Sequence, residues 1–104
     1  MFTGSAVFDL LLPAQTSSLK EKRSIVRPIV TALRRLEVAA AEVGRLDLHR
    51  RAEVGVATVA VDARRVRDVL DACERLVAGR PEVQLLDVRR QLTSSTDEEL
   101  AAHG

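Results

Sequence analysis

The sequence predicts an α+β domain of the ferredoxin-like class, a βαββαβ sandwich whose four-stranded antiparallel sheet carries both helices on one face. Two observations lead to this prediction. Strand-like segments, clearest at 2–12 and 52–61, combine with two segments whose apolar residues recur at helical spacing. Six segments thus follow one another in the order strand, helix, strand, strand, helix, strand. The 104 residues suffice for one core, so we expect one domain over 1–92 and a flexible tail over 93–104.

The first strand and the first helix have the clearest signals. Apolar residues alternate over 2–12, which is typical of a strand with one buried face. Ser18 and Glu21 then have the spacing of a capping box, in which each side chain bonds the backbone amide of the other residue. We expect the helix to run over 19–36 and to kink near residues 24–27, because Pro28 removes the backbone hydrogen bond to the carbonyl oxygen of Ser24.

The second and third strands are predicted together. The segment 38–43 is short and rich in alanine, so it could extend the first helix or form a strand. We predict a strand, because 52–61 is a clear β run that needs a neighbour. The polar segment 45–51 is then the loop between these two strands.

The second helix and the last strand complete the order. Asp62 is expected to cap a helix over 63–78, which carries an apolar stripe at helical spacing. Gly79 and Pro81 are typical of a helix end. The run 83–92 is then the fourth strand.

A sheet with both helices on one face leaves its other face bare. The first and third strands have apolar residues on both sides, and such a face is too apolar for open water. We therefore expect a homodimer in which a second copy covers this face about a two-fold axis. The residues assigned to this dimer face are Val7, Leu11, Val54 and Val56.

Basic residues concentrate in the first helix and in the loop that follows the second strand. Nine basic and four acidic residues lie between Leu19 and Arg51, and several of the bases share one helix face. Such a surface binds phosphate groups in a salt-dependent way, although a solvated face of an arginine-rich protein is the alternative interpretation. The residues assigned to nucleic-acid binding are Lys20, Lys22, Arg23, Arg27, Arg34, Arg45, Arg50 and Arg51.

The aromatic residues limit how RNA would be bound. Trp and Tyr are absent, and Phe2 and Phe8 both fall on the predicted core side of the first strand. Recognition of single-stranded bases normally needs exposed stacking platforms. Contacts to the RNA backbone or shape are therefore expected, and no DNA specificity is expected.

The sequence offers no catalytic or metal-binding constellation, and we expect no cofactor. His49 lies near Asp47 but has no second histidine or nucleophile beside it, and zinc usually takes three or four ligands. Cys73 is the only cysteine and lies on an apolar stripe, which favours a buried, inert thiol. The acylphosphatase reaction is disfavoured, because the loop 13–17 lacks glycine and the chain lacks Asn.

The expected location is the cytoplasm. No apolar run approaches the roughly 18 residues that a membrane span needs. The apolar start of the chain lacks a basic leader and is interrupted by Asp9. A single cysteine also suits a reducing compartment.

Three segments together resemble the YlxP-like family of small bacterial proteins: 18–24, 41–57 and 81–88. The resemblance implies a ferredoxin-like fold without an established activity, so no catalytic residue is carried over. Members are often encoded among translation genes, which implies RNA or a ribosomal subunit as a partner. The chain departs from the family pattern at His49, where an aromatic residue is expected, and at Pro28.

Two functional hypotheses follow. The first is a non-enzymatic accessory protein that contacts RNA or a ribosomal subunit through the first helix and the loop 45–51. The alternative is a dimeric regulatory or ligand-binding module that uses the apolar sheet face, and an enzyme ranks third.

Overall fold

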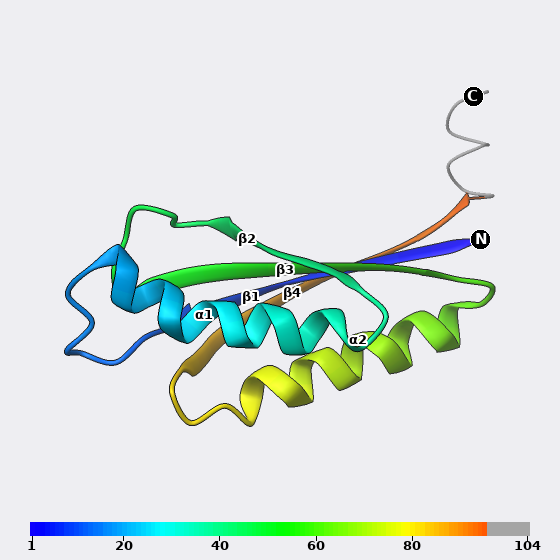
Figure 1. Ribbon diagram of the computed structural model, residues 1–104. Helices are drawn as coiled ribbons and strands as arrows, with labels where there is room; N and C mark the ends of the chain where they lie inside the picture. Colours follow the sequence, from blue (N-terminus) through cyan, green and yellow to red (C-terminus); the bar gives the residue numbers. More distant parts are fainter. Residues whose placement is uncertain (96–104) are drawn as a thin grey trace.

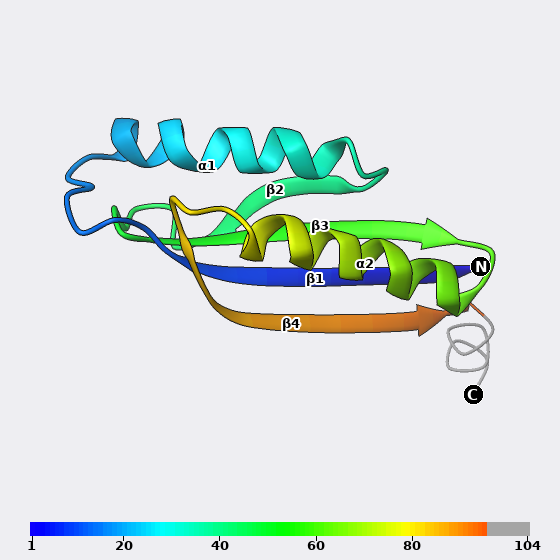
Figure 2. The same cartoon turned by 90° about the horizontal axis from the view of Figure 1, so that it is seen from below.

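The computed structural model describes residues 1–95 and has the predicted ferredoxin-like architecture (Figure 1). Its strands form one antiparallel sheet in the order β2-β3-β1-β4. Both helices lie on the same face of this sheet, and α1 lies beside β2 (Figures 1 and 2). The elements are β1 (Phe2–Leu11), α1 (Leu19–Arg34), β2 (Ala39–Gly44), β3 (Arg51–Ala60), α2 (Ala63–Ala78) and β4 (Gln84–Ser94).

The element boundaries follow the sequence prediction with two differences. Helix α1 ends at Arg34, and Glu37 turns the chain toward β2 with a φ of 64°. Because a left-handed turn usually contains glycine, the glutamate at this position gave no sequence signal for the turn. Strand β4 continues to Ser94, so the predicted tail is wrong for residues 93 and 94. The Ser95 amide donates to the carbonyl oxygen of Met1, and residues 96–104 of the predicted tail lie outside the described residues.

Both helices begin at the predicted caps. The Ser18 side chain accepts a hydrogen bond from the Glu21 amide at 3.1 Å, but the Glu21 carboxylate bonds Ser17 and not Ser18. The Asp62 side chain accepts from the Arg65 amide at 2.8 Å. Helix α1 continues through Pro28 without interruption.

The core lies between the sheet and the two helices. Residues of β1 and β3 that alternate along each strand meet the apolar stripes of α1 and α2. Cys73 belongs to the α2 stripe and is fully buried, and this burial raises the pKa of its thiol. The largest apolar side chains of the core are Phe8, Leu10, Leu12, Ile29 and Leu33.

The strand register assigns each residue of β3 to one face of the sheet. Phe8 is paired with Val54, and Ala6 with Val56, so both valines lie on the helix side and are buried. Their assignment to the dimer face is therefore wrong. Val7 and Leu11 point to the side without helices, where they are half-buried. We call that side the open face.

Gly4 allows α2 to pack against β1. A Cβ atom at this position would overlap Val66 Cγ1 and would lie 3.2 Å from Leu70 Cδ1. We expect Gly4→Ala to lower the free energy of unfolding by about 1–3 kcal/mol, because the added methyl group overpacks the interface. Urea unfolding measures this loss, with Ser5→Ala on the same strand as the control. A Gly4→Ala protein as stable as wild type would contradict the packing described.

The Cys73 thiol is expected to stay unreactive in the folded protein. Burial excludes reagents, and the raised pKa keeps the thiol protonated where an ordinary thiol begins to ionise. A colorimetric disulfide reagent should modify it only after denaturant is added. The positive control is Leu46→Cys, which places a thiol at an exposed position in the loop after β2. Rapid modification of the native wild-type protein would show that α2 does not seal this site.

Candidate nucleic-acid interface

Four basic side chains form one exposed surface on α1. The buried stripe of this helix faces the sheet, and Lys20, Arg23, Arg27 and Arg34 project on another side, all of them exposed. They fall within one stripe because their offsets of 3, 7 and 14 residues bring them to the same side of a helix with 3.6 residues per turn. We call these four residues the α1 basic face.

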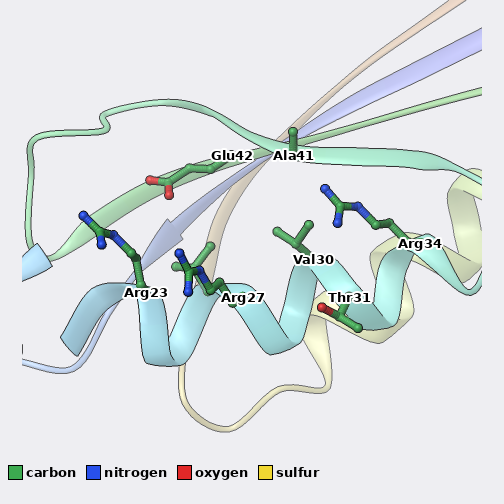
Figure 3. Close-up of a pocket in the computed structure, with 8 residues that line it drawn as sticks. Arg23, Arg27, Val30, Thr31, Arg34, Ala41 and Glu42 are labelled. Carbon is green, nitrogen blue, oxygen red and sulfur yellow. The ribbon is translucent and has the colours of Figure 1, made fainter. Parts of the chain in front are cut away.

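Three of these arginines line a hollow between α1 and the outer edge of β2. Figure 3 shows Arg23, Arg27 and Arg34 on the side of the helix that faces Ala41 and Glu42. The hollow has a volume of about 420 Å³. A second hollow, of about 540 Å³, lies on the outer side of α1. Arg23 and Arg27 line both, so their guanidinium groups are accessible from two sides.

The α1 basic face has no carboxylate partner within residues 1–95. Arg34 Nε donates to the carbonyl oxygen of Ala40 at 3.1 Å, and the other three side chains make no hydrogen bond or ion pair with the described part of the chain. Five other arginines are different. Those at positions 45, 51, 65, 89 and 90 all have acidic partners within 4 Å. Basic side chains without an acidic partner among residues 1–95 are therefore most numerous on α1, while α2 carries two of them, Arg67 and Arg75.

Lys22 does not belong to this surface, so its assignment to nucleic-acid binding is wrong. Its side chain is 2% exposed. Its Nζ lies 2.7 Å from Glu42 Oε2 and donates to the carbonyl oxygen of Arg45 at 2.7 Å. The ammonium group thus ties α1 to β2 and to the loop that follows β2.

Arg45 and Arg51 are also engaged, on the open face. The Arg51 guanidinium bonds both carboxylate oxygens of Asp9, at 2.8 and 2.7 Å. Arg45 Nε lies 3.0 Å from Glu53 Oε1 and 3.8 Å from Asp9 Oδ1. Because these charges are neutralised within the chain, neither residue offers a free cation to a phosphate. Both assignments to nucleic-acid binding are therefore corrected.

Arg50 remains available. It lies in the β2–β3 loop, where it is exposed and makes no side-chain hydrogen bond or ion pair with residues 1–95. It lines a hollow of about 460 Å³ with His49 and Thr16, the latter in the connection that leads into α1. Five of the eight predicted positions therefore carry accessible, carboxylate-free charge: Lys20, Arg23, Arg27, Arg34 and Arg50.

The titratable side chains of the β2–β3 loop make no ion pair with one another. Asp47 and His49 are exposed and share no hydrogen bond. Among residues 1–95, no group of three or more His, Cys, Asp or Glu side chains is placed to hold a metal ion. Neither of the described helices combines the length and the apolar character needed to cross a membrane.

Comparison with known proteins identifies a family but no activity. A family model described as a protein of unknown function, DUF503, matches residues 3–90. No curated protein matches the chain. The match covers all six helices and strands except Phe2 of β1 and the last four residues of β4, 91–94.

We expect Lys22→Met to destabilise the fold. Glu42 would lose its ammonium partner and the Arg45 carbonyl its donor, and breaking a buried ion pair costs about 3–5 kcal/mol. Since Glu42 is 21% exposed, we expect the lower end of that range, about 3 kcal/mol. The control is Lys20→Met on the same helix, which should unfold at the wild-type urea concentration. Equal midpoints for the two variants would contradict the structural role of Lys22.

Proposed function

The chain belongs to the DUF503 family, whose function is unknown, and we propose that it is a non-enzymatic accessory protein that binds the RNA backbone through α1. The RNA would be free or part of a ribosomal subunit, in the cytoplasm. The observation that carries this proposal is the concentration of unpaired bases on the α1 basic face. By contrast, the arginines of the sheet at positions 51, 89 and 90 all lie within 4 Å of a carboxylate.

The spacing of the arginines suits a chain of phosphates. Arg23 and Arg27 are separated by about 6 Å along the helix axis, and Arg34 continues the same row. Each planar guanidinium presents a fork of donors that matches two phosphate oxygens. A polyanion lying along α1 would therefore meet several forks in succession, and binding would release counterions and weaken with salt.

We expect the protein to recognise the backbone or the shape of RNA and not its bases. Phe8 is fully buried and Phe2 is half-buried against the core, so neither is a stacking platform for a base. Trp and Tyr are absent. Sequence-specific reading of single-stranded RNA depends on such platforms. We therefore propose contacts with little base preference and no specificity for DNA sequence.

The resemblance to the YlxP-like family adds an association. Its members are often encoded with translation genes, which favours RNA of the translation machinery as the polyanion. A shared gene neighbourhood does not explain how a protein binds RNA. The physical support for RNA binding is therefore the arrangement of charges on α1.

A second candidate is a dimeric regulatory or ligand-binding module that uses the open face. Val43 and Val59 favour it, because they are 54% and 62% exposed on that side of the sheet. The two candidates use opposite sides of the molecule, so one does not exclude the other.

We expect reversal of charge at Arg23 and Arg27 to abolish most RNA binding. The matched control is Arg67→Glu with Arg75→Glu on α2, which changes the net charge equally at two exposed arginines without acidic partners among residues 1–95. Fluorescence anisotropy with a labelled RNA duplex should show at least about a tenfold loss of affinity for the α1 pair and less than about threefold for the α2 pair.

Salt dependence gives a second measurement on the same proteins. Loss of two phosphate contacts should make the slope of log K against log salt less negative by about 1.8 for a duplex. Equal losses for the α1 and α2 pairs would show that only net charge matters. A wild-type protein with no salt-dependent RNA binding would overturn the proposal.

A further inference from the structure

The open face carries an apolar patch on its β2–β3–β1 part. Its residues come from three neighbouring strands, and no element of residues 1–95 covers them. Val59 and Val43 are its largest exposed members, at 62% and 54%. We call this set the open-face patch: Val7, Ala39, Ala41, Val43, Ala57 and Val59.

The centre of the patch is flat because it contains a glycine. Gly55 is paired with Val7 on one side, and Val43 packs over it from the irregular end of β2. A Cβ atom at Gly55 would lie 3.0 Å from Val43 Cγ1. With only hydrogen at this position and a methyl group at Ala57, a second flat surface can approach the sheet closely. Face-to-face sheets pack about 10 Å apart.

The charges on the same face are balanced within the chain. Asp9, Glu53 and Asp87 pair with the guanidinium groups of residues 45, 51 and 89 at distances between 2.7 and 3.8 Å. Three carboxylates thus meet three cations, and this network leaves no net charge. A strongly charged partner would therefore have no net electrostatic attraction to the open face. A second copy of the same face would meet no net electrostatic repulsion.

The size of the face fits a small dimer interface. Strands β1 and β3 have 10 residues each, β4 has 11 and β2 has six. With about 3.3 Å per residue and about 4.8 Å between strands, the face spans roughly 600 Å². Two copies would bury about 1,200 Å², which is the lower end for specific protein interfaces.

From these observations we propose that a second copy of this chain covers the open face, sheet against sheet about a two-fold axis. The open-face patch forms the centre of the contact and the balanced ionic network lies toward one end. This inference is independent of the proposed RNA contact, because α1 lies on the opposite side of the sheet. The dimer would present two α1 basic faces to solvent, pointing away from each other.

Sedimentation equilibrium of the full chain tests the proposal. The wild type should have twice the 11.4 kDa mass of one chain at high micromolar concentration. Val59→Asp should shift it to the monomer mass, because two carboxylates would be buried in the apolar seam. The matched control is Leu46→Asp in the β2–β3 loop, which is 59% exposed and should remain a dimer. Thermal unfolding checks that each variant is folded.

A crosslinking experiment covers the case in which Val59→Asp fails to fold. Ala57→Cys adds only a thiol at the centre of the patch, and a short bis-maleimide should link two such chains, whereas Leu46→Cys should give little product. A monomeric wild type would overturn the proposal. So would a dimer whose Leu46→Cys variant crosslinks as well as Ala57→Cys, since the seam would then lie elsewhere.

Discussion

The two helices lie on one face of the sheet because the chain crosses over twice in the same sense. β1 and β2 run parallel with β3 between them, and β3 and β4 run parallel with β1 between them, so α1 and α2 both serve as crossover helices. Such connections are almost always right-handed, which places both helices on the same side. Every other feature of the surface depends on this constraint. The helix side carries the α1 basic face. On the opposite side, no helix of residues 1–95 covers the apolar and charged side chains of the sheet.

One buried cation ties α1 to the β2 edge of the sheet, beside the apolar stripe that packs the helix on the core. Lys22 reaches from the helix to Glu42 and to the Arg45 carbonyl, and so joins three consecutive parts of the chain at the β2 edge of the sheet. This anchor holds the neighbouring arginines along the outer edge of β2, where they line a hollow. Lys22 is therefore structural, while Arg23, Arg27 and Arg34 stay exposed on the same helix. On the open face, the buried Asp9 carboxylate is neutralised by ion pairs with Arg51 and Arg45.

The sequence was sufficient for the fold and for part of the surface. Alternation identified β1, and capping residues with apolar stripes identified both helices. The alanine-rich strand β2, which helix propensity opposed, was inferred because the β run at 52–61 needs a neighbour. Lys22 was misassigned although a signal existed, since it lies four residues before Val26 on the buried stripe. Val54 and Val56 were misassigned because valines occupy both faces of β3, and only pairing with Phe8 and Ala6 decides which face is buried. The pairing of Arg45 and Arg51 with Asp9 joins segments more than thirty residues apart, and no local pattern reveals such a contact.

The central claim is that the helix side of this domain binds the RNA backbone through α1. The most direct measurement is a titration of isotope-labelled protein with an RNA duplex, followed by amide chemical shifts. Binding through α1 predicts shifts at α1 and at the β2–β3 loop, which high salt should reverse. Shifts confined to the open face around Val7 and Ala57, or no shifts at any residue, would contradict it.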